Sequence, residues 1–272
     1  MTGSMTIPYF IIDTFTTEKF RGNPTAVCVT GKPLPAAIMH AVAKELRFPV
    51  TAFVEEVTAG DEYPIRYFTV TGEIAACGHA TLAAANVLTD SLLKERIRFS
   101  TIENIQIDIR IEEDIVYMFY PRYSMELLDV SPGLLQSLGI EKFREAGFCK
   151  ELETVFIELE DAALLKSIQP DYRWMVKSNP FIKEVVITCR ADNNQYDFLL
   201  RSFCPWIGID EDPVTGSVHS VLAHYWKERT GKYDLTAYQA SERGGEVYVK
   251  ALDDKVLLGG RTVTMGRGDL SV

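Results

Sequence analysis

The stretch that decides the fold is Cys77-Gly78-His79-Ala80-Thr81-Leu82-Ala83-Ala84-Ala85, which follows the strand-like segment Arg66-Tyr67-Phe68-Thr69. The helix predicted over residues 78–88 has apolar or small residues on every face, apart from His79 at its start and Asn86 near its end. A helix without a continuous polar face must be buried on most sides. The sequence therefore predicts a helix enclosed by strands, as in a β-barrel that closes over a central helix.

The second half of the chain repeats this pattern. Arg201-Ser202-Phe203-Cys204 precedes Thr215-Gly216-Ser217-Val218-His219-Ser220-Val221-Leu222-Ala223. Both copies predict a strand, an acidic loop, a turn of small, glycine and polar residues, and an apolar helix. The acids of the two loops are Glu73 in the first copy and Asp210, Glu211 and Asp212 in the second. The shared order favours an internal duplication.

Strands outnumber helices in the predicted elements, which indicates an α+β protein. Runs rich in β-branched and aromatic residues predict most strands, and strict alternation over Ile105–Ile111 predicts a strand with one buried face. The other predicted strands are 9–12, 26–29, 51–57, 65–69, 115–120, 154–159, 184–189, 197–203, 246–251 and 262–265. The predicted helices are 35–46, 78–88, 162–168 and 217–229.

We therefore predict two similar domains, each a β-barrel wrapped around a central apolar helix. The N-terminal domain comprises residues 1–112, to which a final strand at 264–272 returns, and the C-terminal domain comprises residues 113–263. Two such domains would present the starts of their central helices to a common cleft, where ligands usually bind. The active site is accordingly predicted in the cleft between the domains.

Composition and charge exclude several classes of protein. The net charge of −10 argues against a surface for nucleic acid or anionic membrane, and no run of about 20 apolar residues predicts a membrane span. The five cysteines form no CxxC pair, which is typical of reduced thiols in the cytosol. The four histidines lack the spacing of a metal site. We expect a cytoplasmic protein without a bound metal, and residues 1–4 resemble a leader that precedes Met5.

Glu45 is the first candidate for acid/base chemistry. In the predicted helix, Glu45 lies within about 20° of Ile38 and so borders the apolar stripe. It also lies near the helix C-terminus, where the dipole disfavours a carboxylate. Both effects raise the pKa of a carboxyl group, as a proton shuttle near neutral pH requires. The alternative is a glutamate at the edge of the stripe that bends out to solvent.

The turn at Cys77-Gly78-His79 is the second candidate. Gly78 allows the backbone to approach a ligand, and the amides that follow can hold a carboxylate. Cys77 could serve as an acid/base thiol, because a helix N-terminus stabilises a thiolate. Alternatively, Cys77 is a small buried apolar residue and His79 is a cap or a hydrogen-bonded core group.

The segment from Gly208 to Ser217 is the third candidate. Asp212 could act as a hydrogen-bond partner or a second base, while Gly216 and Ser217 offer backbone amides and a hydroxyl group. The acids of this segment lack the spacing of an EF-hand. The alternative is simple helix capping by Asp212 or Thr215.

These motifs, in this order, resemble the signatures of the phenazine-biosynthesis PhzF-like family. The resemblance covers essentially the whole chain. The segments that carry it are Gly22-Asn23-Pro24-Thr25-Ala26-Val27, Glu45 followed by Thr51-Ala52-Phe53-Val54, Arg66 to Thr69, Glu73 with Cys77 to Ala85, Asp212-Pro213-Val214-Thr215-Gly216-Ser217, and the late Gly260 and Gly266.

The resemblance implies a fold like that of diaminopimelate epimerase, a homodimer and no cofactor. By position, it implies that Glu45 is the acid/base residue and that His79 and Asp212 are its polar partners. The positions expected to hold the substrate are Asn23, Cys77, Gly78, Gly216 and Ser217. Related epimerases and racemases use two cysteines, and residues 212–216 contain none, which argues against a two-thiol racemase. The phenazine enzyme also has Pro-Leu-Leu where this chain has Ala80-Thr81-Leu82.

Three hypotheses about function follow. The leading one is a cofactor-independent isomerase that moves a proton on a small carboxylate-bearing metabolite, with Glu45 as general acid/base. The second is a non-catalytic protein that binds a metabolite or serves as a scaffold. The third is an amino-acid epimerase that uses Cys77. In each case the expected ligand is a small anionic metabolite, with neither nucleic acid nor membrane as a partner.

Overall fold

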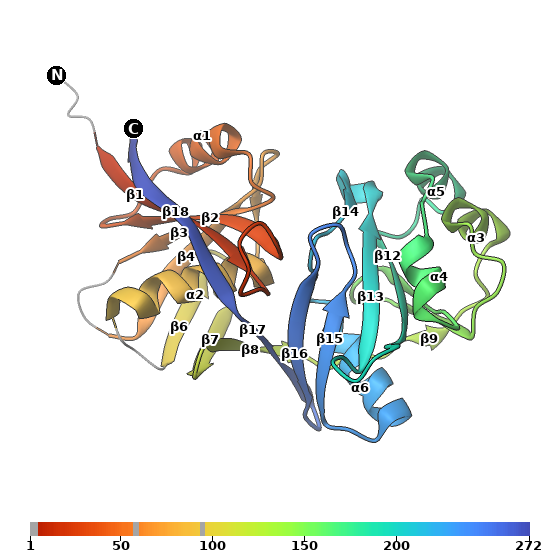
Figure 1. Ribbon diagram of the computed structural model, residues 1–272. Helices are drawn as coiled ribbons and strands as arrows, with labels where there is room; N and C mark the ends of the chain where they lie inside the picture. The colour runs from red at the N-terminus through yellow and green to blue at the C-terminus, as the bar shows by residue number, and fades with distance from the viewer. Residues whose placement is uncertain (1–4, 57–59, 93–95) are drawn as a thin grey trace. The chain divides into compact units, whose positions relative to one another are not determined.

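The two apolar helices belong to two different units of the structure (Figure 1). The computed structural model describes residues 5–56, 60–92 and 96–272, so the suggested leader and the end of the strand predicted over 51–57 lie outside the described residues. One unit comprises Met1–Phe119 with Gly259–Val272, and the other comprises Tyr120–Leu258. The chain passes from one unit to the other within β8 (Ile115–Pro121) and returns within β17 (Lys255–Gly260). The first predicted boundary, after Glu112, instead falls between two paired strands.

The first unit is a mixed sheet with two helices. Its remaining elements are β1 (Thr6–Thr14), β2 (Asn23–Thr30), α1 (Ala36–Leu46), β3 (Thr51–Glu55), β4 (Glu62–Phe68), β5 (Glu73–Ile74), α2 (Gly78–Leu92), β6 (Arg96–Thr101), β7 (Gln106–Glu112) and β18 (Thr262–Ser271). Its strands pair in the order β18-β1-β2-β3-β4-β6-β7-β8. Of these pairs, β2–β3 and β4–β6 are parallel. Parallel neighbours need a crossover, which α1 and α2 supply.

The helix α2 is enclosed on all sides, as its sequence predicts. Its side chains from Ala80 to Ala85 are fully buried, and it contacts β1, β2, β3 and β18. The helix α1 covers the opposite face of the sheet, where Met39, Val42 and Ala43 pack against β2, β3 and β4. The sheet therefore has an inner face toward α2 and an outer face toward α1.

The second unit repeats the order of strands and crossovers. Its elements are β9 (Glu126–Leu127), α3 (Pro132–Leu138), β10 (Glu145–Cys149), β11 (Thr154–Glu158), α4 (Ala162–Ser167), α5 (Tyr172–Ser178), β12 (Glu184–Arg190), β13 (Phe198–Cys204), η1 (Pro205–Ile207), β14 (Ile209–Glu211), α6 (His219–Thr230), β15 (Asp234–Gln239) and β16 (Gly245–Ala251). Its strands pair in the order β9-β10-β11-β12-β13-β15-β16, with β11–β12 and β13–β15 parallel. Antiparallel and parallel pairs alternate in the same order in both units, along β1-β2-β3-β4-β6-β7 in the first and along β10-β11-β12-β13-β15-β16 in the second. The duplication predicted from two short motifs thus extends to the whole topology.

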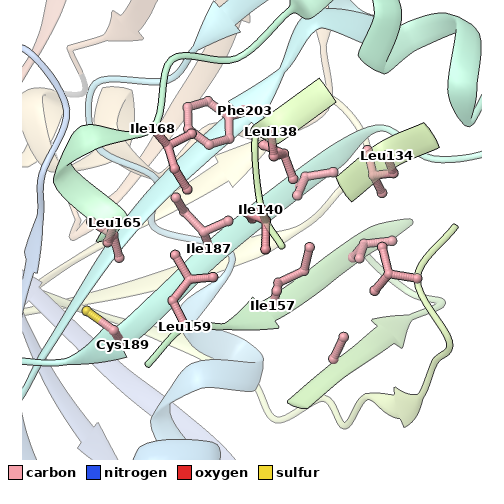
Figure 2. Packing of buried hydrophobic residues seen from close by; sticks show 14 of the residues in the cluster. Leu134, Leu138, Ile140, Ile157, Leu159, Leu165, Ile168, Ile187, Cys189 and Phe203 are labelled. Carbon is pink, nitrogen blue, oxygen red and sulfur yellow. The ribbon is translucent and has the colours of Figure 1, made fainter. Parts of the chain in front are cut away.

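The outer layer is where the two units differ. Leu134 and Leu138 of α3 and Leu165 of α4 pack against strand residues such as Ile157 and Ile187 (Figure 2). The sequence reading predicted the six-residue α4 but missed α3 and α5, which have seven residues each, because the periodicity of about two turns does not reliably indicate a helix. It also missed β6, β10, β15 and β17. No helix in the described ranges is long and apolar enough to cross a membrane.

Candidate active site

Several candidate residues of the first unit gather at one end of its sheet. The strands β2 and β3 are parallel, with Ala26 opposite Thr51, so both begin at this end. The antiparallel β4 finishes here, because Phe68 also lies opposite Thr51. The helix α1 runs back from the end of β2 to the start of β3, which brings its last turn, and Glu45, to the same end. The short β5 pairs with the end of β4 and leads into α2, so Gly78 begins its helix here too.

Glu45 is exposed in the last turn of α1. The buried stripe of the helix consists of Met39, Val42 and Ala43, while Ile38 is only half-buried. A residue beside Ile38 in projection therefore lies outside the contact with the sheet. The exposure of Glu45 agrees with the alternative in which a glutamate at the edge of the stripe bends out to solvent.

His79 is held between two other candidate residues. Its Nδ1 lies 3.4 Å from Asn23 Nδ2 and 3.4 Å from Cys77 Sγ. Burial lowers the pKa of His79 to about 4, so the imidazole is neutral at neutral pH. Because an amide N–H can only donate, the contact with Asn23 favours the tautomer with its proton on Nε2. A neutral His79 can then donate a hydrogen bond to a ligand without carrying a charge.

The start of α2 is fixed by a hydroxyl pair. The Thr81 hydroxyl bonds the Cys77 carbonyl at 2.7 Å and the Tyr67 hydroxyl at 2.5 Å. Cys77 is half-buried, so it is not the inert core residue of the alternative reading. The first amides of a helix have no intrahelical acceptor, and they favour an anion. Gly78 and His79 therefore offer a place for a carboxylate.

Gly22 sets the position of Asn23. Its φ is +64°, and a Cβ at this position would lie 2.0 Å from the Thr14 carbonyl oxygen. The Thr14 hydroxyl in turn donates to the Asn23 carbonyl at 3.0 Å. Only glycine fits such a close approach of two backbones. The segment that begins with Gly22 thus orients the amide that contacts His79.

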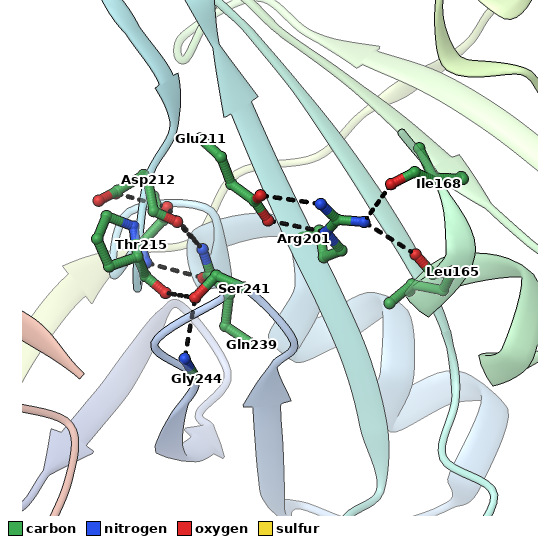
Figure 3. A network of polar contacts seen from close by, with 10 residues as sticks. Leu165, Ile168, Arg201, Glu211, Asp212, Thr215, Gln239, Ser241 and Gly244 are labelled. Carbon is green, nitrogen blue, oxygen red and sulfur yellow. Dashed lines mark hydrogen bonds and ion pairs between the residues drawn. The ribbon is translucent and has the colours of Figure 1, made fainter. Parts of the chain in front are cut away.

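In the second unit, the turn from Asp212 to Gly216 is clamped by a glutamine (Figure 3). The fully buried Gln239 donates from Nε2 to the Asp212 carbonyl at 2.7 Å and accepts from the Thr215 amide at 2.8 Å. The Ser241 hydroxyl donates to the Pro213 carbonyl at 2.6 Å. These bonds leave the turn little freedom to move.

Asp212 and Thr215 bind each other ahead of α6. The Thr215 hydroxyl donates to Asp212 Oδ2 at 2.6 Å, and the residue that precedes the helix, Val218, makes no side-chain cap. A Cβ on the buried Gly216 would lie 3.1 Å from the Tyr120 hydroxyl, so a larger residue would force that ring to shift. Ser217 is half-buried beside it.

The sequence reading missed the residues that hold this site. Gln239 comes from the end of β15, and no local pattern links it to a turn that lies earlier in the chain. Tyr67 was read as an ordinary strand residue. Within the described residues, no group of three or more His, Cys, Asp or Glu side chains is arranged to hold a metal ion.

Residues 12–268 match the sequence model of the family described as phenazine biosynthesis-like protein. The chain belongs to this family. Among relatives, an uncharacterized isomerase of Halalkalibacterium halodurans is 34% identical over 98% of this chain and 99% of its own. A phenazine biosynthesis-like domain-containing protein of Homo sapiens is 30% identical over 92% of this chain and 93% of its own. This member of the phenazine biosynthesis-like family is an isomerase.

Solved structures agree with the fold. A PhzF-family phenazine biosynthesis protein of Enterococcus faecalis is 34% identical, with a TM-score of 0.91 over 98% of this chain and 100% of its own. A probable proline racemase of Agrobacterium radiobacter is 12% identical, with a TM-score of 0.61 over 98% and 93% of the two chains, and it shares the fold alone. The predicted diaminopimelate epimerase-like fold of two similar barrels is thereby confirmed.

Proposed function

We propose that this isomerase moves a proton on a small carboxylate-bearing metabolite without a cofactor, with Glu45 as general acid/base. The observation that carries the proposal is the topology of the first unit. It brings the last turn of α1 to the end of the sheet where Asn23 and the start of α2 lie. The exposure of Glu45 leaves its carboxylate within reach of a ligand, and a bound substrate would displace water from it.

In this proposal the amides of Gly78 and His79 hold the substrate carboxylate. Glu45 takes a proton from a carbon made acidic by the substrate and returns it to another carbon, so no proton is gained or lost overall. His79, neutral at neutral pH, donates a hydrogen bond to the charge that migrates. Asp212, Gly216 and Ser217 are proposed to serve the same reaction, with Gln239 fixing their turn.

The proposal predicts solvent-proton exchange that depends on Glu45. Purified protein is incubated in D2O with an extract of small cell metabolites, and mass spectrometry identifies any compound that gains deuterium. The variant Glu45→Gln should lower the rate of deuterium gain by roughly 10²–10⁴-fold, the usual contribution of a placed acid or base. The matched control is Glu55→Gln, because Glu55 lies at the opposite end of β3 and should leave the rate unchanged.

The same assay separates the alternatives. One contact favours the reading in which Cys77 is the acid/base group, since its Sγ lies 3.4 and 3.7 Å from the two nitrogens of His79. In that case Cys77→Ala would abolish exchange while Glu45→Gln retained it. A metabolite that binds tightly and gains no deuterium would instead indicate a binding or scaffold protein.

A further inference from the structure

Glu184 is a carboxyl group that the proposed reaction leaves unused. It is the first residue of β12 and faces α6, because the alternate residues Val185 and Ile187 belong to the outer cluster. Thr188, on the same face as Glu184, accepts a hydrogen bond from Trp226 of α6 at 3.0 Å. Glu184 therefore lies on the inner face of the second unit.

Two hydroxyl groups bind this carboxyl group. Ser202 donates to Oε1, and Thr154 donates to Oε2 at 3.0 Å. Both hydroxyl side chains are fully buried, and none of the ion pairs between described residues includes Glu184. Desolvation raises the pKa of Glu184, and the two hydroxyl donors oppose that rise in part. The half-buried Glu184 therefore ionises less readily than an exposed glutamate.

The other unit shows that the fold does not need this carboxyl group. Thr51 lies opposite Phe68 in the first unit, as Val185 lies opposite Phe203 in the second. Glu184 therefore corresponds to Val50, which is 5% exposed. A carboxyl group costs more to desolvate than the valine of the duplicate, and carboxyl groups with perturbed pKa values concentrate at functional sites.

Ser202 connects Glu184 to Asp212. The Ser202 hydroxyl binds Glu184, and the Ser202 carbonyl accepts the Asp212 amide at 3.0 Å. Cys204 lies two residues after Ser202 in β13, and its thiol is buried. Burial raises the pKa of this thiol, and the charges of Asp212 and then Glu184 raise it further.

We propose that Glu184 is a positioning residue that acts on Asp212 through Ser202 and takes up a proton from solvent when an anionic substrate binds. In the uptake, an O–H bond of a hydronium ion breaks as an O–H bond forms at a Glu184 oxygen, and the added positive charge offsets the charge that the substrate carboxylate brings. This inference rests on the proposed function, in which Asp212 serves a reaction on a carboxylate. Glu184 would then be a residue of the second unit that binds a proton, as Glu45 is in the first unit.

The stability of Glu184→Gln tests the carboxyl group without any substrate. Glutamine keeps the shape and accepts the Ser202 hydroxyl, but it does not titrate. Because the folded pKa of Glu184 is raised, the wild type loses stability as pH rises from the unfolded value of about 4.3 through the folded value. The gain of Glu184→Gln over the wild type should therefore be absent at pH 4 and grow toward pH 8. A gain that does not grow with pH would overturn the proposal.

Denaturation followed by tryptophan fluorescence measures the difference in stability between Glu184→Gln and the wild type in the second unit, which contains Glu184. All three tryptophans, Trp174, Trp206 and Trp226, lie in the second unit. The matched control is Glu158→Gln, at the other end of β11, whose carboxylate accepts from Tyr225 and Arg229. This control should lose stability at neutral pH, because its carboxylate is paired with a cation.

The deuterium assay then tests the positioning role. Glu184→Gln should lower the rate at least tenfold and remove one ionisation from its pH profile, and Ser202→Ala should reproduce both effects by cutting the connection. Glu158→Gln should keep the wild-type rate and profile. Unchanged rate and profile in Glu184→Gln would overturn the role. If the wild type itself exchanges nothing, the proposed function fails, and the stability measurement still decides whether Glu184 is a raised, unpaired acid.

Discussion

Each unit carries an arginine–glutamate pair at the same point of its fold. In the first unit, Arg66 of β4 forms two bonds to Glu73 of β5, at 2.6 and 2.7 Å. In the second, Arg201 of β13 forms two bonds to Glu211 of β14, at 2.8 and 2.9 Å. Each guanidinium also lies over the phenylalanine two residues later in its strand. The motif thus survives in both copies with its geometry intact.

The two pairs differ in what else they bind. Arg201 is 8% exposed and donates to the Leu165 and Ile168 carbonyls of the α4 region, at 3.3 and 2.7 Å (Figure 3). The Arg66 side chain is 23% exposed. The second unit has three outer helices over its sheet, and Arg201 connects one of them to the strands. The arginine of the second pair therefore also holds an outer helix in place, in the unit that has more outer helices.

The largest effect that this comparison predicts is for Arg201→Met. The substitution leaves Glu211 without its cation and two carbonyls without a donor, so we expect a loss of about 3–5 kcal/mol in the free energy of unfolding. Denaturation followed by tryptophan fluorescence reports the second unit directly. The exposed Arg190, at the end of β12, provides a control in Arg190→Met. If Arg201→Met lowered the free energy of unfolding by less than about 1 kcal/mol, the buried pair would contribute no more than an exposed one.

A second comparison concerns one histidine in each unit, of which His219 is fully buried and His79 is partly buried. His79 in the first unit and His219 in the second each have a pKa lowered to about 4 by burial. The unfolded chain binds protons more readily, near a pKa of about 6.5, so stability is present above that value and is lost as pH falls through about 4. Each histidine should account for a loss of roughly 3 kcal/mol on full protonation.

Imidazole NMR titrations check these values, and variants separate the units. His219→Gln should flatten the acid dependence of tryptophan fluorescence, whereas His79→Gln should leave that signal as it is in the wild type. An NMR midpoint near 6.5 for either ring would contradict the expected burial effect. Equal flattening by both variants would mean that the two units unfold together in acid and not independently.

The sequence predicted what depends on local pattern. A helix apolar on every face can only be central, so α2 and α6 and the duplication were foreseeable from residues 77–85 and 215–223. Features that depend on contacts between distant segments were not. Gln239 clamps a turn from another strand, and Glu184 differs from Val50 only when the strand registers are compared. The sequence left open whether Glu45 is exposed, because a helical projection gives direction and not the width of the buried stripe.

The smallest expected effect is for Arg66→Met. Its pair with Glu73 is partly exposed, and such pairs contribute up to about 1 kcal/mol. Because the first unit lacks tryptophan, amide hydrogen exchange of β4 and β5 measures the change there. Added salt should weaken the wild-type protection and leave the variant unaffected, since salt screens exposed charges. A loss as large as that of Arg201→Met would mean that the bidentate pair itself, and not its connection to an outer helix, supplies the stability in both units.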